Sequence, residues 1–167
     1  VYVFFIKGGG GSEPYDFKIE RSSLILLDKK GKNLWRFETG LENLETEEEY
    51  RTHFQFRRLD AHGWSLFPHL MIRDINQDGH SEVLFSLQTL DELKEGVLVC
   101  FDSKGHELWR FKAGREMVFG DFVYSTDYRI WGFDCHDLDH DDKVEIIVFS
   151  KNRPDFPCQI VILDSGG

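Results

Sequence analysis

The chain has 167 residues, of which 41% are hydrophobic and 30% are charged. This length and composition are typical of one globular domain that is large enough to bury a core. The formal net charge of −10 repels phosphate backbones and argues against binding to nucleic acid. No stretch approaches the roughly 18 consecutive apolar residues that a membrane span requires.

The chain begins with a strand-like run at residues 1–7, followed by a glycine-rich stretch at residues 8–12. Glycine and serine without apolar neighbours are typical of flexible linkers. Residues 1–12 are therefore interpreted as a strand-like peptide on a tether, either natural or engineered. Residues 13–167 are expected to carry the fold.

An apolar run followed by a turn with Asp at its start and Gly at its end occurs three times. The turns are Asp28–Gly31, Asp102–Gly105 and Asp164–Gly167. This pattern fits a type I turn with a glycine bulge, so each copy predicts a β-hairpin. In the first two copies the next strand alternates Trp and Phe with Leu and Arg, at residues 33–37 and 107–111, which gives it one aromatic face.

An insert at residues 41–67 separates the first hairpin from the next strands. Thr46 and Glu49 have the spacing of a helix capping box, and Tyr50 and Phe54 follow four residues apart. This pattern favours a short helix or ordered loop over one end of the sheets. A solvated acidic run is the alternative interpretation.

A second connection, residues 115–129, is rich in Phe and Tyr. Such residues are expected either to cap an edge of the core or to form a contact surface for a partner. The sequence leaves both possibilities open.

Two nine-residue loops, Asp74–Glu82 and Asp137–Glu145, are copies of one acidic pattern. Each has an acid at positions 1, 5 and 9 and Asn or Asp at position 3. Apolar runs of strand length precede and follow each loop, so each is predicted to be a tight connection between two strands. Oxygen donors at alternate positions around a turn converge on one point, as a hard cation such as calcium requires.

The spacing excludes an EF-hand, which needs a bidentate Glu at position 12 and flanking helices. Position 12 is Phe85 in the first loop and Val148 in the second. Gly79 at position 6 supplies the positive φ that such a turn usually needs, whereas the second loop has Asp142 there, at some cost. Because position 6 is not a ligand position, Asp78→Ala is predicted to destabilise the protein more than Asp142→Ala.

The acidic loop between two strands resembles the calcium loop of FG-GAP or VCBS repeats. These repeats are the blades of the β-propeller found in integrin α-chain heads and in many bacterial surface proteins. The resemblance covers the chain from about residue 68 to its end, with a partial unit before it. It implies an all-β fold made of β-propeller blades, each a four-stranded antiparallel sheet. The expected parts are a partial blade at 13–40, an insert at 41–67, a full blade at 68–114, a connection at 115–129 and a partial blade at 130–167.

A propeller closes with four to eight blades, so one full blade and two partial blades do not close a ring. The expected alternatives are a fragment, an open stack of sheets, or a propeller that takes its missing strands from a neighbour. Unpaired edge strands would allow such self-association.

The resemblance implies two structural calcium sites. Each would use side-chain oxygens at loop positions 1, 3, 5 and 9 and the main-chain carbonyl at position 7. The implied ligands are Asp74, Asn76, Asp78, His80 and Glu82 in the first loop, and Asp137, Asp139, Asp141, Lys143 and Glu145 in the second. Carboxylates held this close repel one another, and two divalent ions would change the net charge from −10 to −6.

His136 and His140 leave a transition metal as an alternative at the second loop. Among the three cysteines, Cys100 and Cys135 lie in apolar runs and are expected to be buried thiols. A disulfide between Cys135 and Cys158 is the alternative, and the sequence does not decide between them.

The expected function is a calcium-stabilised propeller module for binding or adhesion outside the cytoplasm, either extracellular, on the cell surface or periplasmic. Millimolar calcium there matches weak oxygen-ligand sites. A protein or a glycan would be the partner, and no catalytic residues are assigned. The alternatives are a non-catalytic or substrate-holding part of a propeller enzyme, either polysaccharide-degrading or a quinoprotein, and a structural subunit that assembles by strand exchange.

Overall fold

The computed structural model describes residues 12–63, 65–89, 96–141, 143–152 and 157–167. The strand-like run and most of the linker expected at residues 1–12 lie outside this part of the chain, as does Asp142. The described residues form an all-β fold of small antiparallel sheets, which confirms the expected fold class at that level.

Three sheets form the body of the described chain, and in each of them consecutive strands pair antiparallel. The first sheet contains β1 (Asp16–Glu20), β2 (Ser23–Leu27) and β3 (Asn33–Glu38). The central sheet contains β6 (Leu70–Arg73), β7 (Glu82–Leu87), β8 (Val97–Phe101) and β9 (Glu107–Lys112). The third sheet contains β12 (Tyr128–His136), β13 (Glu145–Asn152) and β14 (Cys158–Leu163).

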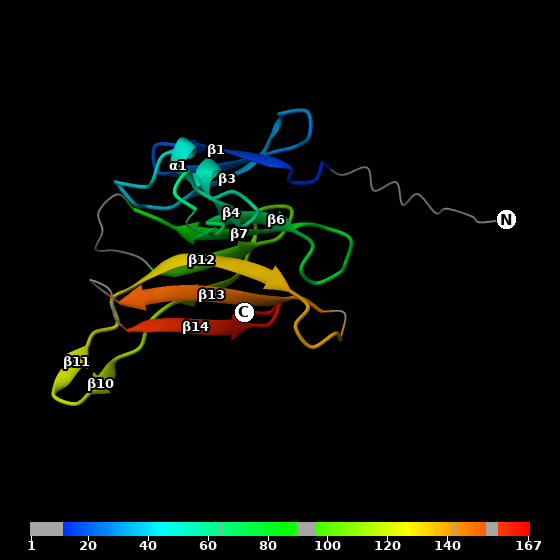
Figure 1. The fold of residues 1–167 in the computed structure, drawn as a ribbon. Coiled ribbons are helices and arrows are strands. Elements are labelled where there is room, and N and C mark those ends of the chain that lie inside the picture. The colour runs from blue at the N-terminus through cyan, green and yellow to red at the C-terminus, as the bar shows by residue number, and fades with distance from the viewer. Residues whose placement is uncertain (1–11, 64, 90–95, 142, 153–156) are drawn as a thin grey trace.

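The sheets pack face to face, with the four-stranded sheet in the middle (Figure 1). Successive side chains of a strand point to opposite faces. Val83 and Phe85 therefore join the core shared with the first sheet, whereas Leu84 and Leu98 join the core shared with the third. Every residue of β7 and β8 is buried, because these strands are covered on both faces.

A tryptophan links each sheet to the next one in the stack. The indole N–H of Trp35 donates to the carbonyl of Ser103 (3.1 Å), and that of Trp109 donates to the carbonyl of Ser165 (3.0 Å). The turn glycine beside each carbonyl lies against the ring: a Cβ added to Gly105 would be 2.7 Å from Trp35. The aromatic face predicted for these strands thus connects neighbouring sheets through their hairpin turns.

The insert contains helix α1 (Glu47–Thr52) and a short hairpin of β4 (Arg58–Leu59) and β5 (Ser65–Leu66). The predicted capping box is present, with Thr46 as N-cap and Glu49 at the third helical position. Tyr50 is fully buried; its hydroxyl donates to the carbonyl of Ser86 (2.9 Å) and accepts from the N–H of Gln88 (2.9 Å). The ordered helix is therefore confirmed and the solvated run is wrong, because Tyr50 anchors the helix to the central sheet.

The second connection forms a hairpin of β10 (Met117–Phe119) and β11 (Phe122–Tyr124). All three cysteines are thiols: Cys100 and Cys135 are buried, as expected, and Cys158 is exposed. The alternative disulfide between Cys135 and Cys158 is therefore not formed. Among the described residues, helix length and hydropathy identify no membrane-crossing helix.

Candidate metal-binding loops

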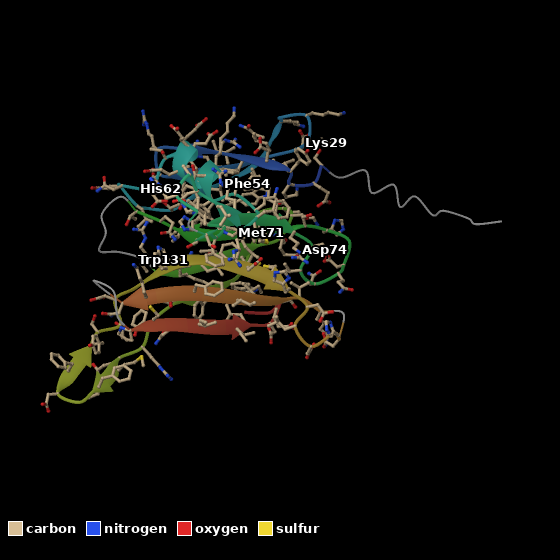
Figure 2. All side chains as sticks on the ribbon, in the orientation of Figure 1. Lys29, Phe54, His62, Met71, Asp74 and Trp131 are labelled. Atoms are coloured by element: carbon tan, nitrogen blue, oxygen red, sulfur yellow. The ribbon has the colours of Figure 1, made fainter. Side chains whose placement is uncertain are left out.

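The two acidic loops occupy equivalent places in the central and third sheets. Asp74 follows β6 and Glu82 begins β7, while Asp137 follows β12 and Glu145 begins β13. Both loops lie at the same end of the stacked sheets (Figure 1), and in Figure 2 Asp74 lies at the end away from Trp131. The predicted strand–loop–strand setting of both loops is confirmed.

Three hydrogen bonds recur at matching loop positions. The N–H at position 2 donates to the Glu at position 9, from Ile75 to Glu82 (3.0 Å) and from Leu138 to Glu145 (2.8 Å). The N–H at position 5 donates to the side chain at position 3, at 2.9 Å and 3.2 Å in the two loops. The N–H at position 7 donates to the Asp at position 5, at 2.8 Å and 2.9 Å. The two copies therefore share local structure as well as sequence.

Both loops place a non-glycine residue in the left-handed region at position 4. Gln77 has φ 61° and His140 has φ 64°, a conformation that costs a non-glycine residue about 1 kcal/mol. Gly79 has φ 88°, as predicted. The turn at position 4 was not predicted from the sequence, because the two loops have different residue types there and Gln, unlike His, is not enriched in this region.

The first loop buries part of its acidic cluster. Glu82 is 2% exposed, and one carboxylate oxygen of Asp74, Oδ1, is buried without a hydrogen-bond partner. Burial raises the pKa of Glu82, and the charges of Asp78 and Asp74 raise it further, against the hydrogen bond from Ile75. Each of these features is an electrostatic cost that a bound cation would reduce.

Asn76 within the first loop and Glu13 outside it also make polar contacts in this region. The amide NH₂ of Asn76 donates to Glu82 Oε1 (3.2 Å) and lies 3.3 Å from Asp78 Oδ2, while its carbonyl oxygen accepts from the N–H of Asp78. The amide must therefore rotate before its oxygen can join the other ligands. Outside the loop, Glu13 pairs with the ring of His80 (2.8 Å), and that hydrogen bond raises the pKa of His80.

The second loop brings three of its predicted ligands together. One carboxylate oxygen each from Asp137, Asp139 and Glu145 lie within 4.8 Å of one another. Asp141 is held instead by Lys143, whose Nζ is 2.9 Å from Asp141 Oδ2. Hydrogen bonds from the side chain and the main chain of Lys143 lower the pKa of Asp141.

Among the described residues, the second loop alone brings three acidic side chains together, and calcium fits this donor set. Calcium ligands lie at about 2.3–2.6 Å from the ion, so two ligands on opposite sides are about 5 Å apart. The oxygens in the second loop already lie within that limit, and the first loop offers a buried oxygen with no partner. His136 and His140 are not members of the ligand group that the described residues bring together, and carboxylates alone are typical of a hard cation.

Comparison of the chain with protein-family models, with curated proteins and with solved structures finds no match.

A second polar cluster, which the sequence did not reveal, lies between the insert and the third sheet. Glu45 is 8% exposed and forms an ion pair with Arg129 (2.6 Å); its other oxygen is 3.7 Å from the ring of His69. His69 stacks on His53, with ring centroids 4.1 Å apart. Burial and then the nearby His69 lower the pKa of His53. Glu45 and Arg129 are far apart in sequence, so no local pattern could have indicated this cluster.

Proposed function

We propose that this protein is a calcium-stabilised β-propeller segment of the FG-GAP or VCBS type, which serves as a binding or adhesion module outside the cytoplasm. The repetition of one acidic loop carries the proposal. Two sheets that pack face to face each have this loop between their first and second strands, with three hydrogen bonds at matching positions. Such repetition is expected when each repeat needs the same ion.

In this proposal each ion joins two strands of one sheet. Asp74 lies at the end of β6 and Glu82 at the start of β7, so an ion held by both fixes the two strand ends against each other. Asp137 and Glu145 have the same relation in the third sheet. Calcium would supply positive charge between carboxylates that repel one another, and its role would be structural.

The two loops favour a calcium-rich environment. In the first loop the amide of Asn76 must rotate, and in the second Lys143 holds Asp141 away from the other acids. Both features weaken calcium binding, and weak sites are filled at the millimolar concentrations found outside cells. The net charge of −10 makes a protein or a glycan a better ligand for the module than a nucleic acid.

Thermal unfolding with and without calcium tests the proposal. For two sites with a dissociation constant near 0.1 mM, 1 mM calcium adds about 3 kcal/mol, or about 5–10 °C in melting temperature. A variant with Asp74→Asn and Asp137→Asn should lose most of this shift, and magnesium should give a smaller one. A melting temperature that is equal in calcium and in EDTA would contradict the proposal.

A further inference from the structure

The β10–β11 hairpin is an apolar arm that other described elements leave uncovered. Figure 1 shows it projecting beyond the stacked sheets, next to β14. Val118 pairs with Val123 on one face and Phe119 with Phe122 on the other. These four side chains are 52–71% exposed. An isolated two-stranded hairpin is marginally stable in water, so an arm that is apolar on both faces indicates a contact surface.

Among the described residues, the arm is anchored at its base. Met117 accepts contacts at its sulfur from the hydroxyl of Tyr128 and from the amide of Gln159, both at 3.4 Å. Beyond Met117, Tyr124 is half-buried and its ring contacts that of Phe119, whereas the other four strand residues of the hairpin are exposed. The structure thus fixes where the arm begins and leaves its tip, Gly120 and Asp121, exposed.

A groove with a volume of about 620 Å³ lies beside the base of the arm. Its apolar wall includes Phe111, Met117, Ile160 and Ile162, and its rim carries Lys112 and Arg115. Ile160 is 67% exposed and Ile162 is 59% exposed. In the central sheet the matching hairpin positions are Leu98 and Cys100, which are fully buried against the third sheet. The groove therefore continues a face that is an inter-sheet contact elsewhere in the molecule.

The two ends of the stack differ in polarity. The outer face of the first sheet carries charged side chains that pair with one another, such as Arg36 with Glu20 and Glu38. The outer face of the third sheet carries Ile160 and Ile162. Among the described strands of these two sheets, the large apolar side chains that are exposed all belong to the third sheet, at Trp131, Ile160 and Ile162.

The arm and the groove are complementary in charge as well as in apolar surface. The tip of the arm carries Asp121 between two phenylalanines, whereas the groove carries Lys112 and Arg115. Neither cation forms an ion pair with any described residue, and neither does Asp121. An acidic aromatic tip matches a basic apolar groove, although the chain as a whole carries a charge of −10.

We propose that two copies of this chain exchange their β10–β11 arms, each arm lying in the groove of the other copy. A two-fold arrangement satisfies both arms and both grooves at once, because the same surface of each copy is used. The contact would bury Phe119 and Phe122 against Ile160 and Ile162, with Asp121 beside Lys112 and Arg115.

Charge reversal with sedimentation velocity tests the exchange. The unaltered chain should sediment as a dimer at tens of micromolar. Asp121→Lys alone should be monomeric, and so should the double variant Lys112→Glu with Arg115→Glu. An equal mixture of the two variants should form a heterodimer, because each arm then meets a groove of opposite charge. A monomeric parent chain, or a mixture that stays monomeric, would overturn the proposal.

Two further measurements distinguish the arm from general surface hydrophobicity. Phe119→Ser with Phe122→Ser should abolish the dimer without changing the melting temperature of the monomer, whereas Phe56→Ser, at a side chain that is 76% exposed elsewhere, should leave the dimer intact. Oxidation of an Asp121→Cys variant should join residue 121 to Cys158, which lines the groove, between two chains. A crosslink within one chain, or a dimer that survives the phenylalanine changes, would contradict arm exchange.

Discussion

The two acidic loops share a motif and three hydrogen bonds, but they manage their negative charge differently. The first loop buries Glu82 and a carboxylate oxygen of Asp74, and the amide of Asn76 donates into the cluster. The second loop is more open, and Lys143 pairs with Asp141. One sequence pattern can therefore be stabilised by burial and a neutral donor in one sheet and by a local cation in another.

The largest expected difference concerns the Glu at position 9. Glu82→Ala leaves the N–H of Ile75, a fully buried residue, without its acceptor, which costs about 2 kcal/mol in the free energy of unfolding. Glu145→Ala should cost less than about 1 kcal/mol, because Leu138 is 45% exposed and water can replace the acceptor. Urea unfolding of the metal-free protein at pH 4, below the ordinary pKa of 4.5 for Glu, measures both values without the cost of the buried charge. Glu82→Gln is the control that keeps an acceptor. Equal losses would mean that the loops do not differ in burial.

The second-largest expected difference between the loops lies in how each contributes to the pH dependence of stability. The pKa of Glu82 is raised from 4.5 by burial and by neighbouring acids, so the folded state binds this proton more tightly than the unfolded state. Its contribution to the stability of the metal-free protein is therefore lost as the pH rises above 4.5 through the folded pKa. The pKa of Asp141 is lowered from 3.8, so its contribution is lost as the pH falls through the folded value.

Urea unfolding between pH 4 and pH 7, after removal of metal, measures this effect. Glu82→Gln should gain stability relative to the parent chain as the pH rises. A difference that stays constant over this range would show that Glu82 does not titrate in the folded protein.

Lys143 should weaken calcium binding in the second loop alone. Its Nζ pairs with Asp141, so Lys143→Met frees a carboxylate and should raise the calcium affinity of this loop about threefold, as expected for an exposed charge pair. Calorimetric titration of a variant whose first loop is disabled by Asp74→Asn isolates the effect. Lys30→Met, in a hairpin turn outside both loops, is the matched control. An unchanged calcium affinity after Lys143→Met would show that Lys143 does not compete with calcium for Asp141.

The smallest effect should be common to both loops. Gln77→Gly and His140→Gly relieve a left-handed backbone at position 4, so each should raise the free energy of unfolding by about 0.5 kcal/mol after the entropy cost of glycine is subtracted. Losses for the two glycine variants would contradict the shared turn geometry.

Local repetition in the sequence predicted the sheets and the loops. The Asp-x-x-Gly turns form in all three copies, since such a turn needs only neighbouring residues. The first two join the paired strands β2–β3 and β8–β9. The short helix also followed from the local spacing of Thr46 and Glu49. Where hydrogen bonds join residues near one another in the chain, the sequence was therefore a good guide.

Features that depend on distant or competing partners were not predicted. The pairing of the Lys143 side chain with Asp141 was not predicted, because only the main-chain carbonyl of Lys143 had been assigned a role, as a metal ligand. The ion pair between Glu45 and Arg129 joins the insert to β12, and neither segment contains a local sequence pattern that predicts it. The arm between β9 and β12 was recognised as rich in aromatic residues, but its exposure depends on what the rest of the fold leaves uncovered.

A calorimetric titration of the metal-stripped protein with calcium tests the two loops most directly. Two ions should bind per chain, with one lost in an Asp74→Asn variant and the other in an Asp137→Asn variant. A titration that shows no bound calcium, or the same two ions in both variants, would contradict the assignment of these loops as calcium sites.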